Sequence, residues 1–290
     1  MITKAFIPCA GFGTRFLPAT KAVPKEMLPI VDTPALQYIV SEAVESGIKE
    51  ILILISPGKK AIVEHFARSG ELEALLIKTG KRDVAEKLKA ITAQAEIRYA
   101  VQDEMKGTGS AVAYAKSWAG GQPFAVLFGD DVIVNDGGAP VTAQLMEAYE
   151  KTFRSVIGVQ EMPEEIARRC GVMIPGKSKG KYHEVRDIME KPGAGIPLPS
   201  KLTSLGRFVL SPDIFDFIDR TPSSKNGEIY LTDALALQAK HSGVFAYEFE
   251  GKRYDIGNKL GYIIANIEFG LKNPETAEGL KAYLKEWNKL

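Results

Sequence analysis

The first half of the chain alternates short apolar runs with segments in which apolar residues recur at helical spacing. Residues 3–9 (TKAFIPC) and 50–56 (EILILIS) are almost continuously apolar, which is typical of strands buried on both faces. Between them, apolar residues from Pro34 to Gly47 share one helical face, and the proline and glycine suit its two ends. The same criteria predict strands at 97–101, 123–128 and 154–160, and helices at 59–68, 71–78, 82–93, 110–119 and 139–152. This alternation predicts an α/β fold with a doubly wound, mostly parallel sheet and right-handed crossovers.

The second half of the chain follows a different pattern. Residues 172–190 (VMIPGKSKGKYHEVRDIME) predict two strands around a turn of glycine, serine and lysine, which is a β-hairpin. No linker, repeat or low-complexity tract separates the two halves, so we expect residues 1–290 to form one domain. The remaining predicted elements are strands at 203–210 and 244–250 and helices at 211–220, 231–241, 258–272 and 276–288.

The composition is that of an ordinary globular protein and excludes several classes. Hydrophobic residues make up 45% of the 290 residues and charged residues 25%, which excludes a disordered chain, a collagen-like fibre and a coiled coil. The formal net charge of +1 leaves no electrostatic basis for binding nucleic acid or an anionic membrane. Cys9, Cys170 and three histidines show no metal-ligand spacing. Without a long apolar run or a signal-peptide pattern, the chain is expected to be cytoplasmic and free of membrane.

A glycine-rich turn follows the first predicted strand. Residues 10–15 read AGFGTR, and Gly11 and Gly13 would let backbone amides approach a phosphate closely. Ligands of open α/β sheets bind beyond the carboxyl ends of the strands, which is where this turn lies. The segment matches neither the full G-x-G-x-x-G pattern nor the P-loop pattern G-x-x-x-x-G-K-[ST], which argues against a Walker-type NTPase. An ordinary turn between strand and helix is the alternative.

Three cations lie close together after the glycine turn. Arg15, Lys21 and Lys25 are separated by Pro18 and Pro24, which prevent an uninterrupted helix. Arginine offers a fork of donors and lysine a point charge, so these residues on a constrained loop indicate a polyphosphate clamp. A solvated basic loop is the alternative.

Carboxylates follow two of the predicted strands. Asp130 and Asp131 come shortly after strand 123–128, and Asp255 follows a later strand. A hard cation such as Mg²⁺ takes one or two carboxylates together with phosphate oxygens, so these aspartates are candidate ligands. Taken alone, Gly-Asp-Asp fits a turn with an Asx cap equally well. Beside the cation-rich turn it favours metal-assisted phosphoryl chemistry, and we expect the aspartates and the clamp cations to share one cleft.

No nucleophile or general base stands out in the sequence. Gly-x-Ser-x-Gly is absent, and no Cys/His pair has a supporting motif. A sugar phosphate has a second pKa of about 6, so at neutral pH it is largely ionised and can attack the α-phosphorus of a nucleotide without losing a proton. Such a reaction needs only alignment, cations and Mg²⁺.

The chain resembles one enzyme family over essentially its whole length. Its opening, AGFGTRFLPATKAVPKEMLPIVDTPALQYIV, is similar to that of bacterial UTP–glucose-1-phosphate uridylyltransferases, or UDP-glucose pyrophosphorylases. The segments ELEALL, FGDD, IMEKP, LGRFVLSP, GEIYLTDAL and RYDIGNKLGY follow in the order of the family. The resemblance implies a Rossmann-like nucleotidyltransferase fold with a mixed, mostly parallel sheet flanked by helices. The hairpin would be a small elaboration in the second half.

The resemblance also implies a reaction and its participants. UTP and glucose 1-phosphate would give UDP-glucose and pyrophosphate, with Mg²⁺ as the cofactor and in-line attack of the sugar phosphate on the α-phosphorus. A nucleotide-binding half would cover residues 1–135, a sugar-binding half 136–270 and a C-terminal helical segment 271–290. The family likeness implies a homodimer or homotetramer, for which the last segment could supply an interface.

Family likeness assigns the site residues to four groups. Arg15, Lys25, Asp130 and Lys191 would be catalytic; Ala10, Gly11, Gly13, Thr14, Glu26, Gln102 and Gly107 would bind the nucleotide; Asp131, Gly171, Glu190, Lys191 and Gly206 would bind the sugar; and Asp130 and Asp255 would hold Mg²⁺. Glu190 and Lys191 are adjacent in a predicted strand, so both can reach a ligand only if the strand twists or ends there. Pro192 favours such an end, and an exposed ion pair is the alternative.

The sequence departs from the family pattern near the base and the sugar. Val101 and Ser110 stand where the family commonly has Arg and His, while Cys170 and Tyr230 stand in place of Tyr and Gln. The clamp residues are intact. These changes leave open a glucose-1-phosphate thymidylyltransferase, or another hexose-1-phosphate nucleotidyltransferase, as the alternative. A catalytically idle sugar-nucleotide binder is a further alternative, against which the intact clamp argues.

Overall fold

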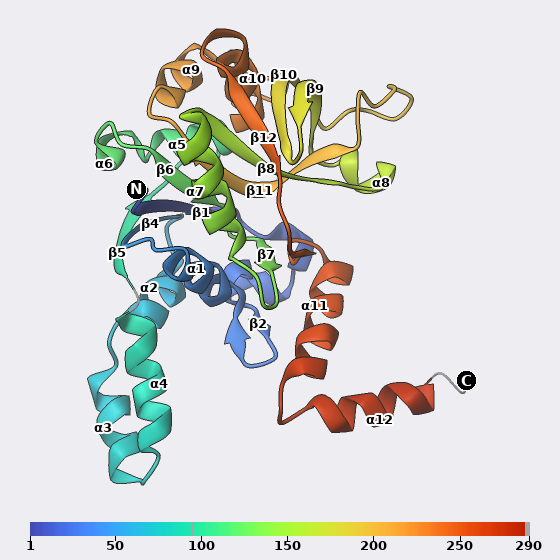
Figure 1. Cartoon of the computed structure of the whole chain (residues 1–290). Coiled ribbons are helices and arrows are strands. Elements are labelled where there is room, and N and C mark those ends of the chain that lie inside the picture. Colours follow the sequence, from blue (N-terminus) through green and yellow to red (C-terminus); the bar gives the residue numbers. More distant parts are fainter. Residues whose placement is uncertain (94, 288–290) are drawn as a thin grey trace.

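The computed structural model describes residues 1–93 and 95–287, and a mixed sheet forms its centre (Figure 1). The predicted mixed α/β fold is confirmed. Within the described residues the main sheet has nine strands, in the order β5 (Glu96–Val101), β4 (Glu50–Ile55), β1 (Lys4–Cys9), β6 (Phe124–Leu127), β11 (Leu202–Leu210), β8 (Ser155–Glu161), β12 (Val244–Glu248), β10 (Tyr182–Glu190) and β9 (Gly171–Lys179).

Parallel pairing prevails on one side of the main sheet and antiparallel pairing on the other, where β12 and β8 are the exception and pair in parallel. β1 pairs in parallel with β4 and β6, and β4 pairs in parallel with β5. β11 is antiparallel to both β6 and β8, and β9 and β10 form the predicted hairpin. The described sheet is mixed as predicted but not mostly parallel, because four of its eight neighbouring strand pairs are antiparallel. All residues of β11 are buried, as in a central parallel strand, although they include Thr203, Ser204 and Arg207, so its sequence does not show the direction of pairing.

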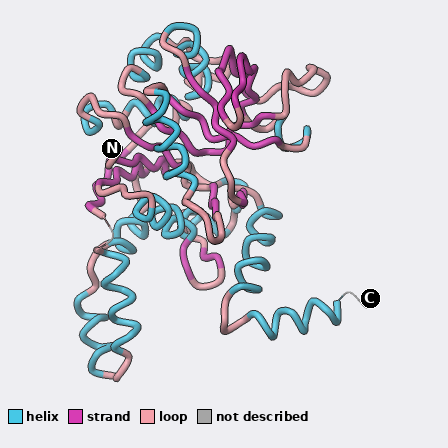
Figure 2. The backbone as a smooth tube through the Cα atoms, viewed as in Figure 1, coloured by secondary structure: helices cyan, strands magenta, loops and turns pink. Residues whose placement is uncertain are grey.

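Helices cover both faces of the main sheet (Figures 1 and 2). Successive side chains of a strand point to opposite faces. Ile7 of β1 therefore shares a core with α1 (Ala35–Glu45) and α7 (Val141–Thr152). Phe6 shares the opposite core with α5 (Thr108–Ala113), α9 (Ile214–Arg220) and α10 (Leu231–His241). Because β1 and β6 are parallel neighbours, the glycine turn and the Gly-Asp-Asp turn leave the same edge of the sheet.

Most predicted helices are present with shifted ends. α2 (Lys60–Phe66), α3 (Gly70–Lys78), α4 (Arg82–Thr92) and α11 (Lys259–Lys272) confirm the predictions. The stretch 110–119 forms two helices instead of one, α5 and α6 (Lys116–Ala119), because Tyr114 and Ala115 donate to carbonyls only three residues back. The last predicted helix is α12 (Ala277–Trp287), and the end of its predicted range lies in 288–290, outside the described residues.

Several short elements escape the sequence pattern. β7 (Asp131–Val134) pairs antiparallel with β13 (Lys252–Asp255), in a register that sets Asp131 opposite Asp255. Strands this short carry too few positions for a periodic signal. The other unpredicted elements are β2 (Pro29–Ile30), β3 (Thr33–Pro34), α8 (Glu164–Ala167) and the 3₁₀ turns η1 (Thr14–Phe16), η2 (Ala19–Lys21) and η3 (Lys25–Met27).

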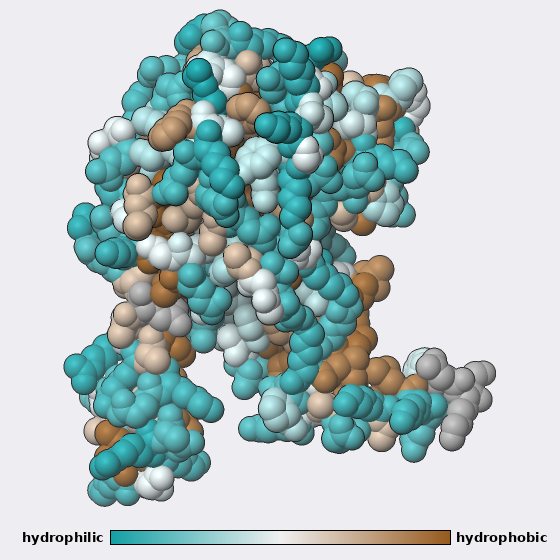
Figure 3. Space-filling view, viewed as in Figure 1, coloured by the Kyte–Doolittle hydropathy of each residue, from teal (hydrophilic) through white to brown (hydrophobic). Residues whose placement is uncertain are grey.

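Two helical segments project from the body of the molecule (Figure 1). α3 and α4 form a helical hairpin, and α12 extends away from the end of α11. Hydrophobic side chains gather along α11 and α12 in Figure 3, and those exposed are Leu260, Ile263, Ile264, Tyr283 and Trp287. Among the described residues, no helix combines the length and the apolar character that crossing a membrane requires.

Candidate active site

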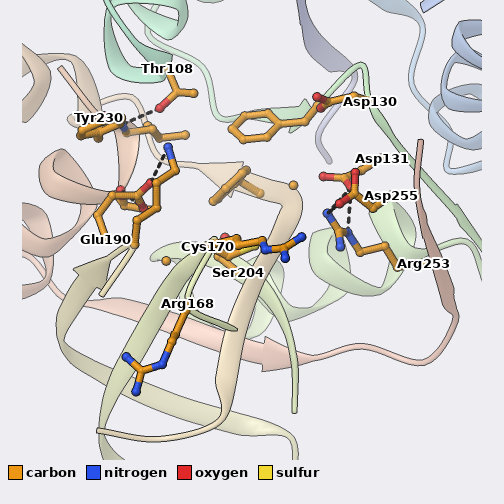
Figure 4. A pocket seen from close by; sticks show the side chains of 18 of the residues that line it. Thr108, Asp130, Asp131, Arg168, Cys170, Glu190, Ser204, Tyr230, Arg253 and Asp255 are labelled. Carbon is orange, nitrogen blue, oxygen red and sulfur yellow. Dashed lines mark hydrogen bonds and ion pairs between the residues drawn. The ribbon is translucent and has the colours of Figure 1, made fainter. Parts of the chain in front are cut away.

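A cleft of about 610 Å³ lies beside the carboxyl end of β6 (Figure 4). Its walls come from both halves of the chain. It brings together eight predicted residues, Arg15, Asp130, Asp131, Gly171, Glu190, Lys191, Gly206 and Asp255. The described residues that line it do not include Ala10, Gly11, Gly13, Thr14, Lys25, Glu26, Gln102 or Gly107. The cleft therefore joins the predicted metal and sugar residues with Arg15, whereas Lys21, Lys25 and the predicted nucleotide residues are not part of its described lining.

An ion pair links the early loop to the Gly-Asp-Asp turn. The Lys25 ammonium donates to Asp130 Oδ2 at 2.6 Å. Burial lowers the pKa of Lys25, but Asp130 and Glu26 oppose this and the net direction is upward. Burial likewise raises the pKa of Asp130, and Lys25 with Arg15 brings it below its ordinary value. Both members of the pair are therefore charged at neutral pH.

Arg15 reaches the same end of the cleft from the glycine turn. Its Nη1 donates to the carbonyl of Gly257 at 2.9 Å. The turn depends on Gly13, which has φ +65° and lies where a Cβ would come within 3.0 Å of the Lys25 Cβ. Glycine at this position therefore lets the loop fold back on itself, so that Arg15 and Lys25 converge near Asp130.

Lys59, just before α2, holds the glycine turn from below and was not among the predicted residues. Its ammonium donates to the carbonyls of Cys9 and Gly11, at 2.5 and 2.7 Å. In a trans peptide the N–H points away from the carbonyl, so the amides that follow these carbonyls point away from Lys59. No motif marks a single lysine in a loop, so only the three-dimensional structure identifies it.

Glu26, which is expected to bind the nucleotide, lies buried beneath the loop. Its side chain is 1% exposed, and both carboxylate oxygens accept from Lys59, at 3.1 and 2.9 Å. Burial raises the pKa of Glu26, and the ammonium groups of Lys59 and Lys25 oppose that rise. The carboxylate is occupied within the protein and supports the loop from inside.

Asp130 and Asp255 face a common space at Gly257, although the oxygens nearest to it also accept from Lys25 and from the Gly257 N–H. A Cβ on Gly257 would lie 2.9 Å from Asp130 Oδ2 and 3.2 Å from Asp255 Oδ1, so glycine keeps this space open. Within residues 1–93 and 95–287 no group of three or more His, Cys, Asp and Glu side chains could enclose a metal. Two carboxylates fit a hard cation that shares its other ligands with phosphate and water.

Asp131 lines the cleft, but its carboxylate is already engaged. Arg253 Nε donates to Oδ1 at 2.7 Å, and the other oxygen lies where a Cβ on Gly206 would come within 2.3 Å. Burial raises the pKa of Asp131 to about 6, with Asp130 and Asp255 adding to the rise and Arg253 opposing it. The Asp131 carboxylate is therefore paired with Arg253, whereas a carboxylate free to bind the sugar was expected. Gly206 leaves the room that this ion pair needs. Arg253 was not predicted, because it lies in a strand too short to be recognised.

Glu190 and Lys191 both face the cleft despite being adjacent. β10 ends at Glu190, and Lys191 has φ +44°, which turns its side chain away from the alternation of the strand. The Lys191 Nζ lies 3.4 Å from Glu190 Oε1, and Thr232 Oγ1 donates to Oε2 at 2.8 Å. Burial raises the pKa of nearby Cys170 to about 11, so this thiol stays protonated and is no nucleophile.

The predicted base-binding residues lie along the neighbouring strand ends. Ala10 follows β1, and Gln102 follows β5, with its amide Nε2 donating to the Glu104 carbonyl at 2.9 Å. Gly107 has φ +93°, and a Cβ there would come within 2.6 Å of the Ile229 carbonyl. The packing of Gly107 against Ile229 explains this glycine without reference to a ligand.

The sequence and the structure match known nucleotidyl transferases. The family model described as nucleotidyl transferase covers residues 4–269. A UTP–glucose-1-phosphate uridylyltransferase of Staphylococcus epidermidis is 49% identical over 285 residues, covering 98% of both chains. A UTP-bound UGPase from Acinetobacter baumannii has a TM-score of 0.90 at 36% identity and covers 99% of both chains.

A UDP-glucose pyrophosphorylase complexed with UDP-glucose has a TM-score of 0.86 at 37% identity, covering 94% of this chain and 100% of the other. Family model, sequence relative and solved structures agree over nearly the full length of the chain. This chain belongs to the nucleotidyl transferase family, among the UTP–glucose-1-phosphate uridylyltransferases.

Proposed function

We propose that this protein transfers a uridylyl group from UTP to glucose 1-phosphate, releasing pyrophosphate and forming UDP-glucose. The observation that carries the proposal is one cleft lined by Arg15 and Asp130 at one end and by Glu190 and Lys191 at the other, with Lys25 paired to Asp130 at 2.6 Å. Support also comes from the names of the relatives and from the UTP and UDP-glucose in the similar structures. These names favour uridylyl transfer over the thymidylyl alternative.

In the proposed mechanism, the protein aligns two charged substrates and supplies no general base. The phosphate of glucose 1-phosphate, with a second pKa of about 6, is mostly dianionic at neutral pH and is itself the nucleophile. Lys191 grips this phosphate and Glu190 accepts hydrogen bonds from sugar hydroxyls. Arg15 and Lys25 stabilise the charge on the transferring and leaving phosphates. This stabilisation is strongest when the donors are already in place before the reaction.

Asp130 and Asp255 would hold Mg²⁺ in this mechanism. The space at Gly257 between their oxygens supports that assignment. The bound cation would neutralise phosphate charge and orient the leaving group. Arg253 keeps Asp131 in place beside them, through the 2.7 Å contact to Oδ1.

We also assign a function to each part of the chain. Residues 1–135 bind the nucleotide, residues 136–270 bind the sugar, and the helical segment 271–290 contributes to a homodimer or homotetramer. Exposed apolar side chains on α12, Tyr283 and Trp287, support an interface in this segment. Because the substrates are phosphorylated metabolites, we place the reaction in the cytoplasm.

The test is pyrophosphate release by the purified protein with Mg²⁺ and a panel of nucleoside triphosphates and sugar phosphates. We expect the highest kcat/KM for UTP with glucose 1-phosphate. Absence of turnover with every pair would refute the enzymatic function. Turnover with dTTP well above that with UTP would refute the base assignment and leave nucleotidyl transfer intact.

A further inference from the structure

The segment that precedes α10 is fixed to the predicted nucleotide half by its backbone. The Ile229 N–H donates to the Lys106 carbonyl at 2.8 Å, and the Leu231 N–H donates to Thr108 Oγ1 at 3.0 Å. Tyr230 lies between these two anchored residues and lines the cleft (Figure 4). The position of its ring is therefore set by contacts on both sides in the chain.

The Tyr230 ring is also restrained at its far end. Its hydroxyl accepts a hydrogen bond from Asn226 Nδ2 at 2.9 Å. The Lys191 Nζ lies 4.8 Å from the centre of this ring, within the range of a cation–π contact. The ring thus forms a fixed surface against which the Lys191 ammonium rests.

The Tyr230 ring restrains the flexible Lys191 side chain in the cleft. The Lys191 side chain is 54% exposed and has several rotatable bonds, so an unrestrained ammonium would lose entropy when it met a ligand. Glu190 Oε1 lies 3.4 Å from the Lys191 Nζ and also restrains the ammonium, but its negative charge cancels the positive charge of the lysine. An aromatic face restrains a cation without a counter-charge, which leaves the positive charge available to an anion.

We infer that Tyr230 is a positioning residue for the phosphate of the sugar substrate and acts through Lys191. The inference rests on the proposed function, since it takes glucose 1-phosphate as the anion that Lys191 meets. It adds a residue that determines affinity for the sugar phosphate and leaves the nucleotide unaffected. The aromatic ring carries this role, and the hydroxyl only helps to orient the ring.

The experiment compares Tyr230→Leu, which removes the ring, with Tyr230→Phe, which keeps it. We expect Tyr230→Leu to raise the KM for glucose 1-phosphate by about three- to thirtyfold, the range of a partly exposed to a desolvated cation–π contact. The KM for UTP and the kcat should change less, and Tyr230→Phe should restore most of the loss. In a Lys191→Met background, Tyr230→Leu should add little, because the two residues act as one unit.

Four outcomes would overturn the inference. Equal KM values for glucose 1-phosphate in Tyr230→Leu and the wild type would show that the ring is not needed. Equal losses for UTP and for the sugar phosphate, or equal losses in Tyr230→Leu and Tyr230→Phe, would indicate a general structural role. Full additivity with Lys191→Met would show that Tyr230 does not act through that lysine.

Calorimetry with UDP-glucose separates this inference from the proposed function. If the wild type binds UDP-glucose without turning over UTP and glucose 1-phosphate, the proposed function fails and Tyr230→Leu is judged on affinity, with Tyr230→Phe as its control. If Tyr230→Leu binds UDP-glucose about three- to thirtyfold more weakly than the wild type, the inference is supported. If its binding is unchanged, the inference is refuted. If the wild type binds no UDP-glucose, both proposals fail.

Discussion

Lys25 and Asp130 lie 105 positions apart in the chain, and their charged atoms meet at 2.6 Å at one end of the cleft. The pair joins the loop after β1 to the turn after β6, two neighbouring parallel strands. Each partner favours the charged form of the other, which raises the pKa of Lys25 and lowers that of Asp130 against the effect of burial. The free protein therefore holds the two groups ionised and in place before a nucleotide arrives.

Removing either member of this pair should impair catalysis strongly. We expect Lys25→Ala and Asp130→Ala each to lower kcat/KM by about 10²-fold or more, as loss of preorganised charge at a transferring phosphate typically does. Steady-state kinetics of pyrophosphate release measures this. Lys116→Ala is the matched control, because Lys116 forms an exposed pair with Asp219 at 2.7 Å away from the cleft. Near-normal activity in both cleft variants would contradict the assigned roles.

Lys59 should stabilise the glycine turn from within. Lys59→Met removes donors to two carbonyls and leaves the buried Glu26 carboxylate without its partner. Breaking a buried pair from one side typically costs about 3–5 kcal/mol, so denaturant unfolding should show a loss of that order. The double variant Lys59→Met with Glu26→Gln should recover part of this stability. A double variant no more stable than Lys59→Met would argue against the stranded charge as the cause.

The catalytic end of the cleft could be predicted because its residues sit in recognisable contexts. Arg15 and Lys25 follow a glycine turn, and Asp130 follows a buried strand, so the rule that parallel strands end at one edge brings them together. Lys59 and Arg253 could not be found in this way. Lys59 belongs to no motif, Arg253 has no predicted role in the RYDIGN segment, and the partner of each lies far away in the sequence, at Glu26 or at Asp131.

The sugar end shows a second limit of the sequence pattern. Adjacent residues of a strand face opposite ways, so Glu190 and Lys191 could not be placed together from spacing alone. The positive φ of Lys191 turns both side chains toward the cleft. The sequence does not predict this backbone conformation, because lysine rarely adopts it. The register of β7 with β13, which sets Asp131 opposite Asp255, likewise depends on pairing between strands of four residues.

Gly206 should tolerate no side chain. It has φ +71°, and an added Cβ would come within 2.3 Å of Asp131 Oδ2. Gly206→Ala combines backbone strain, about 1–2 kcal/mol, with displacement of the carboxylate that Arg253 holds. Gly180→Ala is the control, because φ is +58° there and nothing lies within 4 Å of the added atom. We expect Gly206→Ala to lose both more stability and more activity than Gly180→Ala, measured by unfolding and by kinetics. Equal effects would show that crowding at Asp131 is unimportant.

His65 should make the free energy of unfolding depend on pH below neutrality. Burial lowers the pKa of His65 from its ordinary 6.5, and the ring contacts Gln37 Oε1 at 2.9 Å. As the pH falls through 6.5 toward the lowered value, the unfolded chain binds a proton before the folded protein does, so stability decreases. His65→Gln should flatten this part of the curve in urea titrations from pH 5 to 8, with a small amplitude because the ring is only half-buried. An unchanged slope would assign the effect to other groups.

Gly257 should be needed for the metal more than for the fold. Its φ lies outside the left-handed region, so alanine causes no backbone strain, but the added Cβ would lie 2.9 Å from Asp130 Oδ2 and 3.2 Å from Asp255 Oδ1. It would occupy the space in which these carboxylates are proposed to hold Mg²⁺. We expect Gly257→Ala to raise the Mg²⁺ concentration for half-maximal activity by about tenfold, as small disturbances around metal ligands do.

The unfolding curve of Gly257→Ala should stay close to that of the wild type, which separates metal binding from folding. Gly279→Ala in α12 is the control, since nothing lies within 4 Å of its added Cβ and it is remote from the cleft. Direct titration of Mg²⁺ into the protein with bound UTP gives a readout that does not depend on turnover. If Gly257→Ala binds Mg²⁺ as the wild type does in this titration, the cation does not lie between Asp130 and Asp255. The metal assignment would then have to move to other oxygen ligands, while the clamp of Arg15 and Lys25 would stand.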